Sequence, residues 1–181
     1  MNSIKIIIIK IISIILIVSL FASCSMTYGN RISKSFTKLS SDTCNQKANN
    51  IKLYFDNEKI DFEYEKIGFV EAVGSQYSSN DEIIDNLKYV AWSNCANAII
   101  NIKTDFKQRE SGTLLSDKES IDKYSGKVFN GLAVRILNDT TKTPADTSFV
   151  NKVIGYEQDA NETASNQAAV SIFGAWLLYL S

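Results

Sequence analysis

The chain has three cysteines and no histidine, and these two facts limit the chemistry that its side chains can do. Imidazole is the side chain that most readily changes charge near neutral pH, and it is the commonest metal ligand. Nucleophile pairs of the Ser-His and Cys-His kinds are therefore excluded. Zinc sites usually draw on cysteine and histidine together, so we expect neither a metal site nor a cofactor.

Carboxylates are the other side chains with chemical potential, and they cluster at Asp56, Glu58, Asp61, Glu63 and Glu65. Alternation along a strand would place Asp61, Glu63 and Glu65 on one face, and a small hydrolase works with paired carboxylates. The competing interpretation is a solvated strand face, which the sequence favours because no second catalytic element accompanies the cluster. We therefore assign no catalytic residue and keep the hydrolase as an alternative.

The N-terminus has the pattern of a secretory signal. Lys5 and Lys10 form a positive region, and residues 11–22 form an apolar run. A membrane-spanning helix needs roughly 20 apolar residues, so this run fits a cleaved signal better than a permanent anchor. Without residues 1–23 the chain has 17 basic and 20 acidic residues, a net charge of −3. Nucleic acid, whose binding relies on a basic surface, is not an expected partner.

The end of this signal, Leu20-Phe21-Ala22-Ser23-Cys24, resembles the lipobox of bacterial lipoproteins, although Phe21 stands where leucine is usual. In a lipobox, small residues precede a cysteine that receives diacylglycerol before cleavage. The resemblance implies a signal peptide over 1–23 and lipidation of Cys24, whose acyl chains would bind a membrane stably. Ser25 follows the cysteine, which in well-studied envelopes favours the outer membrane, with the domain facing the periplasm or the outside.

Lipidation of Cys24 would leave Cys44 and Cys95 as the remaining cysteines. Export would place them in a compartment where disulfides persist. A bond between them would close a loop of about 50 residues and so restrict the unfolded chain. We therefore predict a structural disulfide. The alternative is that Cys95 is a small buried apolar residue and Cys44 is an exposed thiol.

One small domain, predicted over residues 51–137, must position these residues. The segment 24–50 before it is polar and is predicted to be a flexible tether. Ser79 and Glu82 form a capping box that begins a helix with an apolar face at Ile83, Leu87 and Val90. Apolar patterns predict strands over 51–55, 62–73 with a bulge at Gly68, 98–102 with a polar extension over 103–110, and 124–137. The predicted class is α+β, strand-strand-helix-strand-strand, with one main helix covering a small antiparallel or mixed sheet.

Residues 138–181 form a C-terminal appendage. After a polar linker, Phe149, Val150, Val153 and Ile154 have the spacing of a short amphipathic helix. The segment 168–180 is apolar almost throughout, yet it is too short to span a bilayer as a helix. Docking on the domain, insertion into the membrane interface and contact with a partner protein remain open for it.

The junction Ala91-Trp92-Ser93-Asn94-Cys95-Ala96-Asn97-Ala98-Ile99-Ile100-Asn101-Ile102 resembles one found in several small α+β domains. These include domains labelled putative heavy-metal-binding, short bacterial envelope lipoproteins and, more distantly, the Rcs stress-sensor lipoprotein. The resemblance covers about Ile51–Leu137. Cys95 replaces a glycine that would serve a left-handed helix cap. Metal binding is not carried over to any residue, because the chain has no histidine and no cysteine pair at ligand spacing.

Together these patterns predict a lipid-anchored protein of the bacterial cell envelope. Its expected function is that of a non-catalytic binding or sensing module with an unidentified ligand. The expected partners are the membrane, through acylated Cys24, and either an envelope protein or a second copy of the chain. The alternatives are a self-assembling structural protein of the envelope and the carboxylate-based hydrolase.

Overall fold

The computed structural model describes residues 27–29, 31–41, 44, 46–113, 121–138, 145–159 and 161–162. The expectations for the signal peptide, for Cys24 and for the apolar segment 168–180 lie outside these residues. Within the described part of the chain, no helix is long and apolar enough to cross a membrane.

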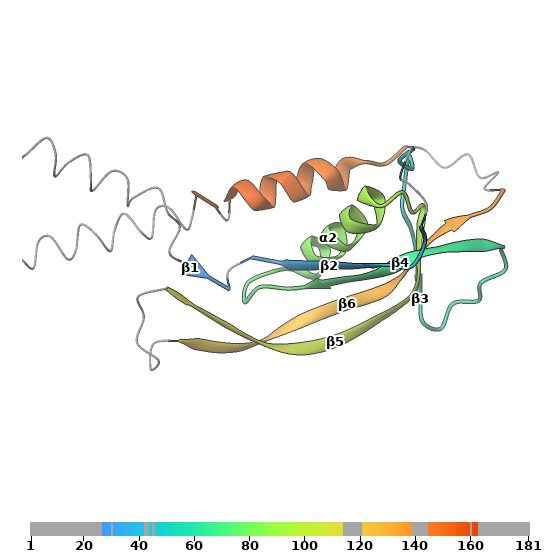
Figure 1. Cartoon of the computed structure of the whole chain (residues 1–181). Helices are drawn as coiled ribbons and strands as arrows, with labels where there is room; N and C mark the ends of the chain where they lie inside the picture. The colour runs from blue at the N-terminus through green and yellow to red at the C-terminus, as the bar shows by residue number, and fades with distance from the viewer. Residues whose placement is uncertain are drawn as a thin grey trace, which may run out of the picture.

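A mixed six-stranded sheet forms the body of the fold, and helix α2 (Asn80–Ser93) lies on one of its faces (Figure 1). The strands are β1 (Thr27–Tyr28), β2 (Ser33–Lys38), β3 (Lys52–Phe55), β4 (Tyr64–Val73), β5 (Ala98–Thr113) and β6 (Asp122–Ile136). Their order is β1-β5-β6-β4-β2, and β3 pairs with β5. The β3–β5 pair is parallel, and the other pairs are antiparallel. The predicted α+β class is confirmed.

Strand β2 corrects the expectation that residues 24–50 form a flexible tether. It pairs antiparallel with β4 over all six of its residues. Phe36 is its one large apolar side chain, and it packs against the core beneath α2. The composition of residues 24–50 does not indicate such an edge strand, because backbone pairing and a single buried ring hold the strand in place.

Helix α2 begins where the sequence predicts. The Ser79 hydroxyl accepts a hydrogen bond from the backbone N–H of Glu82 (3.2 Å), and the Glu82 carboxylate accepts one from the N–H of Ser79 (2.8 Å). This capping box satisfies two amides that the first turn leaves unpaired. The helix then buries its apolar face against the sheet, where the core comprises Ile83, Leu87, Ala91, Val70, Ala72, Ile99, Phe129 and Ala133.

The bulge predicted at Gly68 is present. The register between β4 and β6 shifts between Lys66 and Gly68. A Cβ atom at Gly68 would lie 2.4 Å from the Phe36 ring, so a glycine is needed for β2 to pack closely on β4.

A second helix over residues 148–159 lies beside α2 (Figure 1). Phe149 and Val153 are 2% and 1% exposed, and the ring of Phe149 lies 6.3 Å from that of Trp92 in α2. Ile154 points outward and is 45% exposed. The helix occurs where the apolar spacing predicts one, and it adds to the core under α2.

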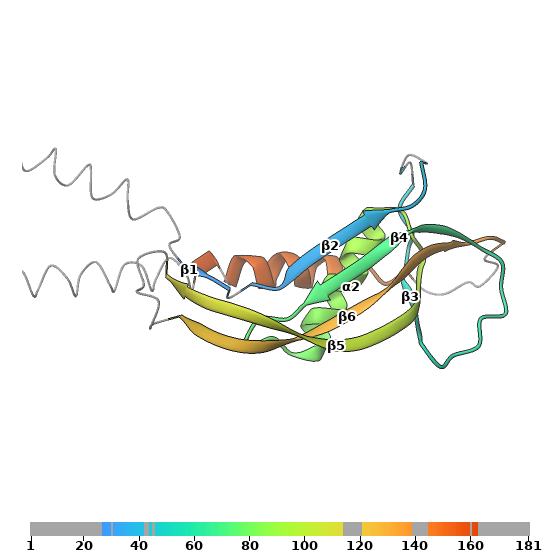
Figure 2. The ribbon, with the colours of Figure 1, turned by 60° about the horizontal axis from the view of Figure 1, so that its bottom comes forward.

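The two faces of the sheet are covered differently. Both helices lie on one face, as Figure 2 shows, where the sheet lies in front of them. At one end of the other face, the loop between β3 and β4 contributes Ile60 and Phe62 to a second apolar cluster. That cluster comprises Ala98, Ile100, Leu132, Val134, Ile136, Tyr54, Ile60, Phe62 and Tyr64. Beyond this loop, the same face carries side chains of β2, β4, β5 and β6 that are not covered by other elements of the described chain. We call this surface the open face.

Candidate functional site

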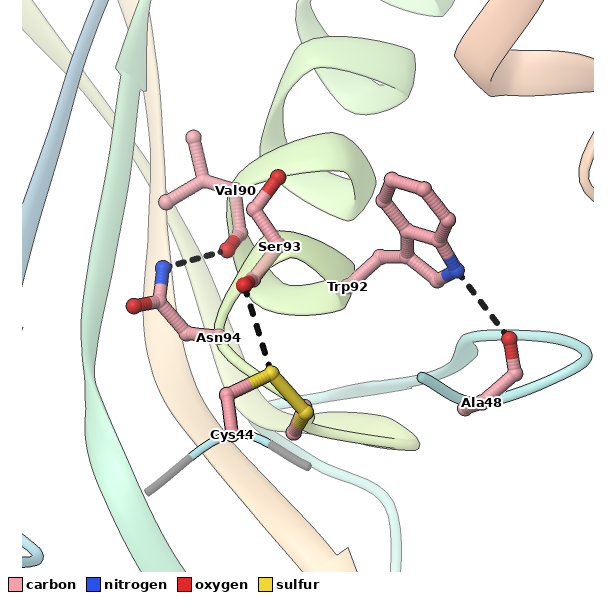
Figure 3. The surroundings of a disulfide bond; sticks show 7 residues. Cys44, Ala48, Val90, Trp92, Ser93 and Asn94 are labelled. Carbon is pink, nitrogen blue, oxygen red and sulfur yellow. Dashed lines mark hydrogen bonds between the residues drawn. A yellow bond between two sulfur atoms is a disulfide. The ribbon is translucent and has the colours of Figure 1, made fainter. Parts of the chain in front are cut away.

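Cys44 and Cys95 lie at disulfide-bonding distance, as the sequence predicts. Their Cα atoms are 5.3 Å apart across a sequence separation of 51. Figure 3 shows the bond at the C-terminal end of α2. Cys95 is 4% exposed, and the bond connects this buried position to the chain segment that leads from β2 to β3.

Cys95 also ends the helix, in a left-handed conformation with φ of 61°. Its N–H donates to the carbonyl of Trp92, and the N–H of Ala96 donates to the carbonyl of Ala91, both at 3.1 Å. These two bonds form the Schellman pattern, in which glycine is the usual left-handed residue. The geometry that the resemblance associates with glycine is thus adopted by a cysteine.

The segment after Cys44 is tied to the same helix end. The sulfur of Cys44 lies 3.6 Å from the carbonyl of Ser93, and the indole N–H of Trp92 donates to the carbonyl of Ala48 (3.1 Å) (Figure 3). The ammonium group of Lys47 lies 3.8 Å from the centre of the Trp92 ring, a cation–π contact. These contacts assign a structural role to the cysteine pair, since they position a chain segment and present no free thiol.

The expected shared face of Asp61, Glu63 and Glu65 does not form, because β4 begins at Tyr64 and only Glu65 belongs to the strand. Asp61 is paired with Lys59 at 2.9 Å. Glu65 is paired with Arg135 at 3.1 Å. Within the described residues, no group of three Asp, Glu, His or Cys side chains is arranged to hold a metal ion.

The open face carries the candidate binding site, a groove of about 410 Å³ over β2, β4, β6 and β5. Small-molecule sites fall in the range of about 300–1,000 Å³. Strand pairing aligns its side chains in two neighbouring rows. The Phe69 row comprises Thr37, Phe69, Leu132 and Ile100, and the Glu71 row comprises Ser35, Glu71, Asn130 and Lys103.

A bulge in β5 brings a further side chain to this groove. The register of β5 against β6 shifts between Ile100 and Lys103, and Asn101 inside the bulge has a φ of 53°. Bulges redirect side chains and are frequent next to functional sites, and asparagine tolerates the left-handed conformation. Gly131 on β6 makes room for the bulge, since a Cβ there would lie 2.7 Å from Ile99 and 3.1 Å from the carbonyl of Ile100.

The charged groups of the groove are paired within the protein. Glu71 lies 3.4 Å from Lys107, and Lys103 lies 3.4 Å from Asp56. Four uncharged polar side chains also line the groove, and none of them has a hydrogen-bond partner in the described part of the chain: Ser35, Thr37, Asn101 and Asn130. The ring of Phe69, 54% exposed, lies among them.

Sequence reasoning assigned no residue to this groove. It grouped Phe69 with the apolar side chains of one strand, whereas the Gly68 bulge places Ile67 and Val70 in the core and leaves Phe69 on the open face. The bulge that the sequence predicts at Gly68 is the signal for this switch, because a bulge shifts the alternation of the residues that follow it. In comparisons with family models, curated proteins and solved structures, the chain matches none.

Proposed function

We propose that this chain is a lipid-anchored protein of the bacterial cell envelope, whose α+β domain binds an envelope component non-catalytically through the groove of the open face. The signal pattern over residues 1–23 and the lipobox resemblance at Cys24 support the anchor. The cysteine pair Cys44 and Cys95 is compatible with export, because disulfides persist in oxidising compartments.

One observation carries the binding function: an exposed aromatic ring lies among polar side chains that have no partner in the described chain. Ligand sites combine apolar surface with a few polar groups that set the orientation of the ligand. The four strands beneath the groove are held by backbone pairing, which keeps the positions of the side chains constant.

The proposed anchor also sets the position of the domain. Thr27 follows Cys24 by three residues and pairs with Thr113 at the end of β5. Three residues of extended chain span about 10 Å. The end of the β5–β6 hairpin would therefore lie close to the bilayer, and the domain would not be lifted away on a long tether.

Photo-crosslinking in cells tests this proposal. A photoreactive residue replaces Thr37, which lies in the groove, and in a matched control it replaces Ile154, which is exposed on the C-terminal helix. We expect a discrete conjugate from position 37 and none from position 154. We also expect Phe69→Ala to reduce the yield of the conjugate from position 37. Equal labelling from both positions, or no conjugate from position 37, would contradict a binding function of the groove.

A further inference from the structure

Resting on the binding function proposed above, we infer that the groove recognises a neutral glycan. The ring of Phe69 stacks on the apolar face of a sugar, and the uncharged polar side chains around it hydrogen-bond the sugar hydroxyls. Four features of the structure lead to this ligand class: the pairing of the sheet backbone, the pairing of the charges, the arrangement of the rows and the bulge at Asn101.

The backbone between the strands beneath the groove is not available to a ligand, and the sheet edge at the groove is the outer side of β2. The groove lies over β2, β4, β6 and β5, whose facing backbone groups bond one another. A bound peptide strand is recognised through the unpaired backbone of a sheet edge. A ligand stacked over Phe69 on the inner strand β4 is recognised by side chains, which suits a molecule that carries its own dense set of hydroxyl groups.

The charges of the groove disfavour an ionic ligand. Lys103 and Glu71, which line the groove, are paired with Asp56 and Lys107 respectively. An anionic lipid headgroup or a nucleic acid requires uncompensated cations. The uncharged polar groups of the groove are two hydroxyls and two amides. Each of them can donate and accept hydrogen bonds, as sugar hydroxyls can.

The two rows match a ligand with one apolar face and a polar rim. Phe69 is flanked in its own row by Thr37 and Leu132, and Ser35 and Asn130 stand in the neighbouring row. Rows on one face of a sheet are about 6.8 Å apart, twice the rise per residue. A ring stacked on Phe69 therefore lies within reach of the polar side chains of the Glu71 row.

The bulge brings one of these polar side chains to the groove. Asn101 is held at a φ of 53° opposite Gly131, where a β-carbon would displace the strand. A left-handed non-glycine residue inside a strand costs energy that regular pairing would avoid. In return for this cost, the groove gains an amide side chain that can both donate and accept hydrogen bonds.

Calorimetric titration of the detergent-solubilised full chain tests the inference. The probes are two neutral oligosaccharides, chitotetraose and maltotetraose, and one acidic oligosaccharide, tetragalacturonate. We expect at least one neutral probe to bind more tightly than the acidic one. We also expect its Kd to change less than about twofold when NaCl rises from about 50 to 500 mM, because no ionic contact is screened.

Variants of Phe69 separate stacking from simple apolar contact. Phe69→Ala and Phe69→Leu should each weaken binding about tenfold, which corresponds to the stacking energy of an aromatic ring. Phe69→Tyr keeps the flat ring and should bind within about threefold of the unaltered chain. Phe106→Ala is the matched control, because Phe106 is a similarly exposed phenylalanine, 65%, that does not line the groove.

Failure of this inference is distinguishable from failure of the proposed function. Absence of binding to both neutral probes, or equal binding by Phe69→Leu and the unaltered chain, would overturn glycan recognition. If the conjugate formed from position 37 in cells contained protein and no sugar, the binding function would stand and the glycan would be rejected. If position 37 formed no conjugate, both would fail.

Discussion

Cys95 occupies a backbone conformation that glycine usually takes, and its bond to Cys44 coincides with that position. A left-handed conformation costs a residue with a β-carbon about 1–2 kcal/mol. Cross-linking a loop of about 50 residues stabilises the folded state by about 4 kcal/mol through restriction of the unfolded chain. The cross-link is the larger effect, so a cysteine at this cap stabilises the fold despite its backbone.

These two energies predict how much unfolding free energy different replacements of the cysteine pair lose. The variant C44A/C95A should lose about 4 kcal/mol of unfolding free energy. The variant C44A/C95G should be about 1 kcal/mol more stable than C44A/C95A, since glycine adopts a φ of 61° without a steric penalty. Urea denaturation of the oxidised chains measures both differences. Equal stability of the two variants would mean that the cap relaxes once the bond is absent.

Asn101 has the same left-handed backbone conformation as Cys95, but it lies on the opposite face of the sheet. Both residues have positive φ values, and both lie where the structure departs from regular geometry, one at a helix end and one in a strand bulge. Cys95 serves the packing of the domain through its bond, whereas the side chain of Asn101 has no hydrogen-bond partner in the described chain and lines the groove. The same backbone conformation thus serves stability at one site and a proposed binding role at the other.

At the scale of elements, bulges decide which side chains face the core. Without the shift at Gly68, Ile67 and Val70 would point to opposite faces of β4, because side chains alternate along a strand. The shift in β5 acts in the same way, since Ile99 and Ile102 both join the core under α2. Each bulge therefore completes the core on one face and determines which residues the open face presents.

One side of the helix over residues 148–159 packs in the core, and the contribution of this contact can be measured. Phe149→Ala removes a ring that is 2% exposed and packed on Trp92. We expect a loss of about 3–5 kcal/mol of unfolding free energy. Ile154→Ala on the exposed side of the same helix should change it by less than about 0.5 kcal/mol. Similar small effects for both variants would mean that the helix does not pack on the domain in solution.

At the scale of the whole molecule, one face of the sheet is covered by the two helices (Figure 2). The other face carries the groove. Under the proposed anchor, the lipidated residue precedes Thr27 by three positions, and Thr27 pairs with the end of β5. The groove lies further along β5 and β6, at Lys103 and Asn130, and extends onto β4 at Phe69. An envelope ligand would thus be bound on a sheet face held near, but beyond, the membrane surface.

The intact mass of the chain extracted from membranes, before and after reduction, tests this arrangement. We expect a chain that begins at Cys24 with added acyl mass and that gains the mass of two hydrogen atoms on reduction. Cys24→Ser should abolish the acyl mass and leave the gain on reduction unchanged, because Cys44 and Cys95 are retained. A chain that still carries residues 1–23 would contradict the lipoprotein signal.

The amino-acid sequence by itself determined the features that depend on neighbouring residues. The capping box at Ser79, the bulge at Gly68 and the amphipathic spacing around Phe149 each lie within a few positions of the chain, so local rules suffice to find them. The pairing of Cys44 with Cys95 was predicted on the premise that Cys24 is lipidated, with two unbonded cysteines as the alternative, and the structure places the two at bonding distance.

Only the tertiary structure decided that β2 joins the sheet and that Phe69 faces outward. Ser33–Lys38 has too little apolar surface to reveal a strand by composition, and its place depends on pairing with residues about 35 positions away. The groove likewise combines four strands from across the chain, aligned by a register that two bulges shift. A shift of one residue moves a side chain to the other face of a sheet, so long-range pairing, which local sequence does not specify, placed the candidate site.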